Sequence, residues 1–315
     1  MREVVVSQER RLVFQNTAEP EPKQNEVVIA VKAISLNRGE VRRSRTVDAP
    51  GYRPGWDLAG IVERAAADGS GPEAGSRVVA ITQFHGNPGA WAERVALPTR
   101  SVAELPEEVS FAQAACLPVA GLTALLALDK RGSLLGRSVL ITGATGGVGH
   151  LATQLARLAG AQVVAAVRNE NQADYARRFG AHRVALVGDD PLHASGFGPY
   201  DLILDSVGGD SAGAAMTMLA TDGVCVLFGA SAGATVSFEL QKFYFTGGAR
   251  VYGLVVFDEL ARGESATKGF KRLVPLVASG QLKPDISLEA PWTEIDRVAD
   301  QLIERRFTGK AVLHL

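Results

Sequence analysis

Residues 139–149, VLITGATGGVG, decide the fold of this chain. Val139, Leu140 and Ile141 predict a short buried strand, and a glycine-rich turn follows that strand directly. Apolar residues then recur at helical spacing from Val148 to Leu158. Such a strand, turn and helix let the backbone approach a pyrophosphate and point helix N–H groups at it. The segment predicts a dinucleotide-binding turn, although glycines after a strand can also serve only a tight turn.

The sequence that follows contains the other strands that a dinucleotide-binding sheet needs. Residues 158–167, LAGAQVVAAV, predict a glycine turn and a second buried strand. Residues 201–209 and 223–231 each predict an apolar strand that ends in a small polar loop. Loops at the carboxyl ends of parallel strands are where an open sheet binds its ligand. The cofactor contacts predicted from the turn and these loops are Ala144, Thr145, Gly146, Gly147, Val148, Ser206, Val207, Phe228, Gly229, Ala230 and Ser231.

Arg168 indicates which dinucleotide binds. It follows the second strand, residues 163–167, where the adenosine ribose of a dinucleotide is expected. An acidic residue there would hold the 2′-hydroxyl of NAD. A guanidinium instead makes charge-assisted hydrogen bonds to a 2′-phosphate, each worth about 1.5–3 kcal/mol. With Asn169 as a second candidate donor, these residues predict NADP(H) as the cofactor. The alternative is that Arg168 is a solvated arginine at a strand end.

Composition and charge narrow the class of protein. A chain of 315 residues predicts two domains, each large enough for its own core. The formal net charge of −1 gives no electrostatic reason to expect nucleic acid or an anionic membrane as a partner. Cys116 and Cys225 lie in apolar sequence and predict buried free thiols in a reducing cytoplasm. Residues 111–128 are apolar, but Gln113 and Pro118 interrupt them, so we expect buried helices and no transmembrane segment.

The two ends of the chain differ from its middle in the pattern of predicted helices and strands. The first part contains short apolar runs between proline and glycine turns, which predict a small β-rich domain. Helix and strand patterns then alternate, which predicts a parallel sheet with helices on both faces. The tail returns to a mixed pattern, with a helix expected over residues 293–306. We therefore predict an α/β fold in which a dinucleotide-binding domain, residues 113–255, is inserted into a β-rich domain made of residues 1–112 and 256–315.

Several short segments occur along the chain in the order found in one known family. They are Leu36-Asn37 and residues 54–62, 75–79, 89–93, 117–124, 143–149, 205–209 and 309–313. With them the chain resembles the medium-chain dehydrogenase/reductase superfamily, specifically its zinc-free quinone oxidoreductase and enoyl reductase branch. The resemblance implies a GroES-like catalytic domain around a Rossmann domain, with the active site in the cleft between them. It also implies a homodimer formed through the edge of the Rossmann sheet near residues 250–256.

The resemblance implies roles for residues outside the glycine turn as well. Thr123 fits a threonine that touches the nicotinamide side of the cofactor, with a plain helix hydroxyl as the alternative. Gly309 and Lys310 belong to a matched segment and are assigned to the cofactor. Asn37 aligns with an asparagine near the nicotinamide; the alternative is a strand-end asparagine that caps its own turn.

Hydride transfer from NADPH to a quinone or an α,β-unsaturated carbonyl compound is the chemistry that the resemblance implies. The protein then supplies alignment and a polar environment for the developing enolate. Some relatives place tyrosines five and eleven residues after the asparagine, where this chain has Arg42 and Asp48. Tyr52 is the nearest phenol and the candidate proton donor, with a packing role for Tyr52 and proton delivery by water as alternatives. An NADPH-binding protein with little turnover is a second function class that stays open.

Two related enzyme classes fit the residues less well. Zinc-dependent relatives have a histidine ligand where this chain has Trp56, and a cysteine ligand in the region of Asn37-Arg38. The histidines show no ligand spacing, so we predict no metal, and without a Lewis acid nothing stabilises the alkoxide of an alcohol substrate. Residues 142–149 also fit the TGxxxGxG motif of short-chain dehydrogenases. No tyrosine in this chain is followed by a lysine four places on, which excludes that class.

Aromatic side chains and one histidine are candidates for an apolar substrate pocket, although aromatic residues at such positions are more often core. They are Trp56, Phe84, His85, Trp91 and Phe243. We expect a small-molecule substrate and no nucleic-acid or membrane partner. No motif in the sequence identifies the natural substrate.

Overall fold

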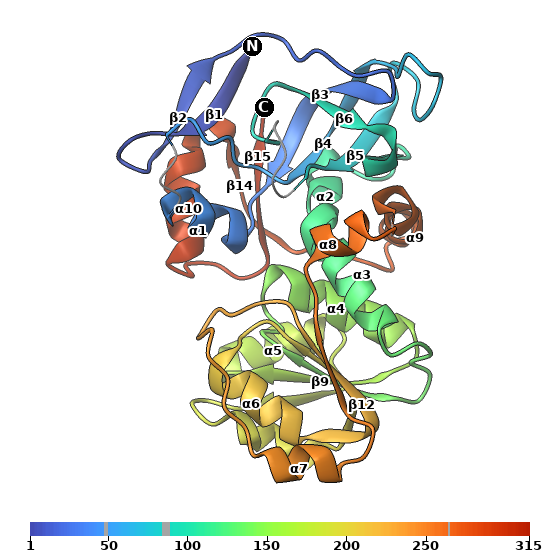
Figure 1. The fold of residues 1–315 in the computed structure, drawn as a ribbon, viewed down its shortest axis with the longest axis vertical. Helices are drawn as coiled ribbons and strands as arrows, with labels where there is room; N and C mark the ends of the chain where they lie inside the picture. Colours follow the sequence, from blue (N-terminus) through green and yellow to red (C-terminus); the bar gives the residue numbers. More distant parts are fainter. Residues whose placement is uncertain (47–49, 84–88, 264) are drawn as a thin grey trace. The chain divides into compact units, whose positions relative to one another are not determined.

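The computed structural model describes residues 1–46, 50–83, 89–263 and 265–315. They form two compact units, Met1–Leu122 with Leu260–Leu315, and Thr123–Glu259 (Figure 1). The domain boundaries predicted from the sequence, after residues 112 and 255, stay a prediction. Of the residues considered for the substrate pocket and the proton donor, Asp48, Phe84 and His85 lie outside the described residues.

The first unit is built on a seven-stranded sheet that runs β14–β15–β3–β4–β5–β7, with β6 paired to β3. A separate two-stranded sheet joins β1 and β2. The strands are β1 (Arg2–Val6), β2 (Leu12–Asn16), β3 (Glu26–Ser35), β4 (Asp57–Arg64), β5 (Arg77–Ile81), β6 (Arg94–Pro98), β7 (Val102–Glu104), β14 (Ile286–Pro291) and β15 (Lys310–His314). The helical segments are α1 (Arg38–Thr46), η1 (Thr99–Ser101), α2 (Phe111–Ala115), η2 (Leu117–Gly121), α9 (Ala266–Ala278), η4 (Trp292–Glu294) and α10 (Ile295–Ile303).

Strand β3 forms the centre of the first unit. Its β-branched residues Val27, Ile29 and Ile34 are at most 1% exposed, as expected for strand formers that pack against a core. On one side β3 pairs antiparallel with β4, and on the other with β15, where Leu313 lies opposite Ile34. The C-terminal strand therefore completes the sheet that the N-terminal segment begins, and it brings Lys310, the first residue of β15, close to the end of β3.

The apolar segment predicted to form buried helices does so, as α2, η2 and α3 (Leu122–Asp129). The predicted capping box opens α2: Ser110 Oγ accepts the N–H of Gln113 at 3.1 Å, and Gln113 Oε1 accepts the N–H of Ser110 at 3.0 Å. Within the described ranges, no helix combines the length and the apolar character needed to cross a membrane.

The second unit, Thr123–Glu259, is a six-stranded sheet in the order β10–β9–β8–β11–β12–β13, and every neighbouring pair is parallel. Counted from β8, this is the doubly wound Rossmann order, which reverses between β8 and β11. The strands are β8 (Ser138–Thr142), β9 (Gln162–Val167), β10 (Arg183–Leu186), β11 (Tyr200–Asp205), β12 (Leu219–Leu227) and β13 (Arg250–Gly253). The helical segments are α4 (Gly147–Leu158), α5 (Glu170–Arg178), η3 (Pro191–Phe197), α6 (Gly209–Thr217) and α7 (Leu240–Phe245), and α8 (Val256–Ala261) runs across the division between the units. The predicted α/β fold with a doubly wound parallel sheet is confirmed.

Two of the aromatic residues considered for a substrate pocket take part in core packing. Trp91 is 1% exposed and belongs to the hydrophobic core of the first unit. Phe243 packs against the core of the second unit. Trp56 is also buried. The alternative given for aromatic residues at these positions, a core role, therefore holds for Trp91 and Phe243.

Candidate active site

The glycine turn joins β8 to α4 at the point where the strand order reverses. Gly143 has a φ of +59°, in the left-handed region that favours glycine. Gly146 is the N-cap of α4, is extended, and gives the helix no side-chain cap. Within the described part of the chain, no side chain of the N-cap residue satisfies the first N–H groups of α4, and the positive end of the helix dipole adds to their attraction for an anion. Thr145, Gly146, Gly147 and Val148 all have solvent-accessible surface here, whereas Ala144 is buried.

Gly149 sets how closely α4 approaches this turn. A Cβ atom on Gly149 would lie 2.3 Å from the carbonyl oxygen of Gly143 and 2.7 Å from Ala144 Cα. A Cβ on Gly143 would lie 2.4 Å from Ser206 Oγ, in the loop after β11. Only glycine fits at both positions without movement of the neighbouring atoms. The glycine turn and the loop after β11 are thus in contact, as the prediction that both serve one ligand requires.

Asp205, at the end of β11, holds these two loops together. Its carboxylate is fully buried and accepts from Thr142 Oγ1 at 2.8 Å and from Ser211 Oγ at 2.7 Å. It also accepts the N–H groups of Val207 at 3.1 Å and Gly208 at 2.7 Å. Sequence reasoning missed Asp205 as a site residue. The available signal was an acidic residue that ends an apolar strand and precedes a small polar loop.

The loop after β12 runs along the loop after β11. The N–H of Phe228 donates to Asp205 O at 3.0 Å, and the N–H of Ser231 donates to Ser206 O at 3.4 Å. A Cβ on Gly229 would lie 2.6 Å from Ser206 O, so the two backbones approach closely. The structure therefore brings Ser206, Val207 and the segment from Phe228 through Ala230 to Ser231 together at the carboxyl edge of the sheet.

Arg168 follows β9 on the same edge and is exposed. Its backbone N–H donates to Gln172 Oε1 at 2.9 Å, while Asn169 Oδ1 caps α5 by accepting the N–H of Gln172 at 3.2 Å. Across the described ranges, no carboxylate pairs with the Arg168 guanidinium. These hydrogen bonds hold the backbone of residues 168 and 169 in place. The Arg168 guanidinium and Asn169 Nδ2 are the side-chain donors available here to a ligand.

In the first unit, Asn37 belongs to a buried polar cluster with Glu40, Asp57 and Lys310. Lys310 Nζ donates to Asn37 Oδ1 at 2.7 Å, and Asn37 Nδ2 donates to Asp57 Oδ2 at 2.8 Å and Glu40 Oε1 at 3.1 Å. Asp57 also accepts from Ser35 Oγ at 2.7 Å. The Asn37 side-chain oxygen thus faces Lys310, which is not the arrangement of an asparagine that caps its own turn.

Tyr52, the candidate proton donor, is partly buried against the core of the first unit. The Arg43 guanidinium carbon lies 5.4 Å from the centre of its ring. Burial, opposed by the Arg43 charge, raises the pKa of the Tyr52 phenol above its ordinary value of 10.0. The phenol is therefore protonated at neutral pH and is a weaker acid than a solvated tyrosine.

The other predicted site residues have local structural roles. Thr123 lies in the first turn of α3 and is 5% exposed. Gly309 has a φ of +63°, and a Cβ there would lie 2.5 Å from Asp285 O, so the turn before β15 needs glycine. Lys310 Nζ contacts the carbonyl oxygen of Leu36 in addition to its partners in the polar cluster. Their predicted cofactor contacts stay predictions.

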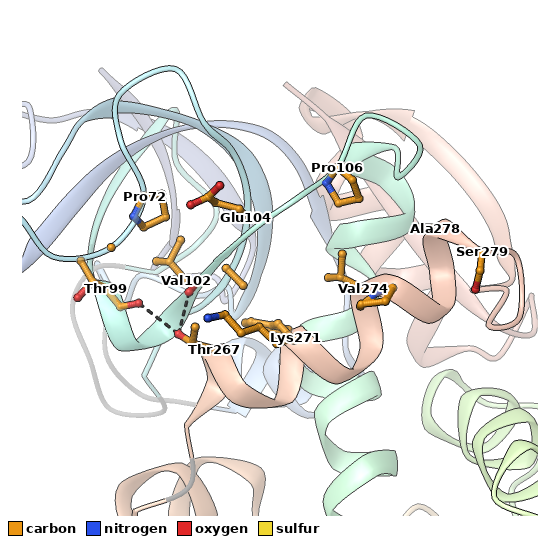
Figure 2. Close-up of a pocket in the computed structure, with 14 residues that line it drawn as sticks. Pro72, Thr99, Val102, Glu104, Pro106, Thr267, Lys271, Val274, Ala278 and Ser279 are labelled. Carbon is orange, nitrogen blue, oxygen red and sulfur yellow. Dashed lines mark hydrogen bonds between the residues drawn. The ribbon is translucent and has the colours of Figure 1, made fainter.

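A cavity of about 790 Å³ in the first unit is lined by none of the predicted site residues. It lies along α9, β7 and η1, and its lining is largely apolar, with Glu104 and Lys271 as the two charged residues among the described residues that line it (Figure 2). At one end Thr267 Oγ1 donates to Thr99 O at 3.2 Å and Val102 O at 2.7 Å. The residues that the sequence predicts to take part in the chemistry therefore lie outside this cavity.

Among the residues that the structure describes, no group of three or more His, Cys, Asp or Glu side chains could hold a metal ion. Cys116 and Cys225 are buried free thiols. Burial raises the pKa of Cys116 to about 12, so this thiol stays protonated at neutral pH and is a poor nucleophile.

Comparison with known proteins matches a segment of each unit to a dehydrogenase family model. Residues 23–107 match the family model described as alcohol dehydrogenase GroES-like domain, and residues 147–278 match the one described as zinc-binding dehydrogenase. The chain is 31% identical to the 2-methylene-furan-3-one reductase of Solanum lycopersicum, over 95% of this chain and 74% of that protein. It is 28% identical to a quinone oxidoreductase of Pseudomonas aeruginosa, over 96% and 95% of the two chains. The structure of Escherichia coli quinone oxidoreductase complexed with NADPH covers 100% of both chains with a TM-score of 0.86 at 25% identity.

A Rossmann sheet with a glycine turn at its reversal point, joined in one chain to a GroES-like β-rich unit, defines an oxidoreductase of the dehydrogenase type. The chain belongs to the medium-chain dehydrogenase/reductase superfamily, in its quinone oxidoreductase branch. The family resemblance stated from the sequence is confirmed.

Proposed function

We propose that this chain is a cytoplasmic, zinc-independent reductase that transfers hydride from NADPH to a quinone or an α,β-unsaturated carbonyl compound. One observation carries the proposal: the uncapped N-terminus of α4 at the reversal point of the sheet, with exposed Arg168 at the end of β9. The quinone oxidoreductase and 2-methylene-furan-3-one reductase relatives, and the Escherichia coli structure complexed with NADPH, support it.

The residues of the second unit fit such a cofactor. The amides at the start of α4 would bind the pyrophosphate, and Arg168 with Asn169 Nδ2 would bind the 2′-phosphate. The neighbouring loops, with Ser206 and Phe228, would line the rest of the dinucleotide. NADPH supplies the hydride when bound, and the protein contributes binding, orientation and the electrostatic environment.

The substrate must take up a proton as well as a hydride. Hydride addition to the β-carbon of an enone leaves an enolate, which is basic enough to be protonated by a weak acid. We propose that this proton comes either from the Tyr52 phenol, which stays protonated at neutral pH, or from water. The resemblance assigns Asn37 to the nicotinamide, and we keep that assignment as part of the proposal.

Stopped-flow oxidation of protein-bound NADPH by a panel of quinones, enones and enals tests the function. We expect rapid oxidation with at least one class and the same rate after treatment with a chelator. NADPH that binds but is oxidised by no compound would instead favour a cofactor-binding protein with little turnover. This second function is favoured by the absence of a tyrosine that some relatives have, because Arg42 occupies its position in this chain.

We further propose that two copies of this chain form a dimer through β13, the last strand of the six-stranded sheet. Val251 on this strand is 42% exposed and Val255 just after it is 46% exposed. A strand that ends a sheet presents unpaired backbone groups, and exposed apolar side chains on it favour pairing with another chain. Pairing about a twofold axis would join the two sheets into one.

Val251→Lys should convert the dimer into a monomer. The substitution places two ammonium groups near the twofold axis and removes apolar contact area from both copies, so association should weaken at least about tenfold. Sedimentation velocity over a range of concentrations measures the effect. Val13→Lys, at another exposed valine of a strand, is the control and should leave the dimer intact. A monomeric wild type, or a variant as dimeric as the wild type, would refute this interface.

A further inference from the structure

The Asn37 side chain has almost all of its hydrogen-bonding capacity occupied inside the protein. An asparagine amide has two N–H donors and an oxygen with two lone pairs. Both donors are used, at 3.1 Å to Glu40 Oε1 and at 2.8 Å to Asp57 Oδ2. The oxygen accepts once, from Lys310 Nζ at 2.7 Å. One lone pair of Asn37 Oδ1 is therefore the only capacity left for a ligand.

Lys310 determines which way this amide points. An ammonium can only donate, so it must face the oxygen, and a flipped amide would place Nδ2 against Lys310 and the oxygen against two carboxyl groups. Lys310 is 2% exposed, and its three donors go to Leu36 O at 3.1 Å, Asn37 Oδ1 at 2.7 Å and Asp57 Oδ2 at 3.3 Å. With no donor left for a ligand, Lys310 Nζ acts on a ligand through Asn37.

Glu40 holds the amide from the opposite side. Its Oε1 accepts both the backbone N–H of Asn37, at 2.6 Å, and Asn37 Nδ2. Its Oε2 is buried and has no hydrogen-bond partner among the described residues. Oε2 lacks a partner among these residues in either protonation state, so the charge decides between them: a neutral Glu40 avoids a second buried negative charge near Asp57. Burial and then Asp57, opposed by Lys310, raise the pKa of Glu40 well above 4.5.

We propose that Lys310, Asp57 and a neutral Glu40 are positioning residues that hold the Asn37 amide in one orientation. Asn37 then offers a ligand a hydrogen-bond acceptor only. It can bind a group that donates, such as a primary amide or a hydroxyl, and it cannot stabilise the oxygen of an enolate. The nature of that ligand rests on the proposed function, whereas the orientation of the amide does not.

Nuclear magnetic resonance of the side-chain amides tests the orientation without any turnover. The chain has six asparagines, so selective 15N-asparagine labelling gives few signals, and Asn37→Asp identifies the pair that belongs to Asn37. We expect slow exchange of the Asn37 amide protons with water in the wild type. Lys310→Met should speed this exchange about tenfold, the effect expected for the loss of one hydrogen bond that orders the amide. An exchange rate that Lys310→Met leaves unchanged would overturn the proposal.

Two further variants separate this effect from unfolding. Lys310→Met with Asp57→Asn removes both buried charges and should show the same fast exchange in a folded protein. Glu40→Gln keeps an acceptor oxygen for Asn37 and should retain slow exchange, whereas Glu40→Leu should not. Failure of NADPH oxidation in the wild type would refute the proposed function alone, because the exchange rates are measured on the protein without substrate.

If Glu40 is neutral in the folded protein, the stability of the fold should depend on pH. Because folding raises the Glu40 pKa above 4.5, the stability that Glu40 contributes is fully present below that pH and is lost as pH rises through the folded-state pKa. Asp57, Lys310 and the Tyr52 phenol are the titratable groups that face it. Glu40→Gln has no proton to lose, so its urea midpoint should rise relative to the wild type between about pH 5 and about pH 8. A difference in midpoint that is the same at both pH values would show that Glu40 is not neutral in the folded protein.

Discussion

Arg168→Asp should raise the KM for NADPH by about 10- to 100-fold and change the KM for NADH far less. One charge-assisted hydrogen bond to a 2′-phosphate is worth about 1.5–3 kcal/mol, which corresponds to this range. The aspartate would also repel the phosphate. The Arg168 guanidinium is exposed and has no carboxylate partner within the described ranges, so its removal should cost little folding stability. Initial rates with each nucleotide, at a saturating concentration of a reactive quinone or enone, measure the effect.

Arg183→Asp is the matched control for this experiment. Arg183 is an exposed arginine of the same unit, but it is the first residue of β10 and thus lies at the amino edge of the parallel sheet. The change in net charge is identical, while the ligand is expected at the carboxyl edge. Equal effects of Arg168→Asp on both nucleotides, or an effect of Arg183→Asp as large as that of Arg168→Asp, would mean that Arg168 is only a solvated surface arginine.

Gly149→Ala should abolish NADPH binding and destabilise the second unit. The added methyl group would lie 2.3 Å from the carbonyl oxygen of Gly143 and 2.7 Å from Ala144 Cα, both of which are backbone atoms. Relief of this overlap requires α4 to move away from the glycine turn, which displaces the amides that would bind the pyrophosphate. Overpacking of this kind costs about 1–3 kcal/mol, and more where the backbone has to move. Fluorescence titration with NADPH and urea unfolding measure the two effects.

Gly196→Ala is the control for Gly149→Ala. A Cβ at Gly196 would meet no atom within 4 Å, and this residue lies in η3, within the same unit. We expect unchanged NADPH binding and nearly unchanged stability. If Gly149→Ala bound NADPH as tightly as Gly196→Ala, the close approach of α4 to the turn would not be needed for cofactor binding.

The second unit was predictable from the sequence because its signals are local. The strand, glycine turn and helix of residues 139–158 occupy one short segment, and their apolar periodicity is strong. The loops with Ser206 and Phe228 could be assigned to the same edge, because parallel strands place their carboxyl ends together. Asp205 was missed. The acidic residue at the end of β11 is visible in the sequence, but its hydrogen bonds with Thr142 and Ser211 depend on the tertiary structure.

The polar cluster around Asn37 could not be predicted in the same way. Asn37 and Lys310 are 273 positions apart, and they meet only because β15 pairs with β3. Glu40 follows Asn37 by about one helical turn, so its position near Asn37 could be predicted. Its burial and its position near the Asp57 charge depend on the pairing of β4 with β3. From the sequence, Lys310 was predicted to contact the cofactor. The structure adds that its ammonium donates to Asn37, Asp57 and the carbonyl oxygen of Leu36.

By itself, the sequence determined the family, the doubly wound sheet and the position of the basic residue that predicts NADPH. Each of these depends on residues close together in the chain or on motifs that stand in a fixed order. Only the tertiary structure decided how Asn37 is oriented and which of its atoms remains available. That outcome depends on hydrogen bonds between segments distant in sequence, inside a buried cluster where the three donors of Lys310 and both donors of the Asn37 amide have acceptors within the protein.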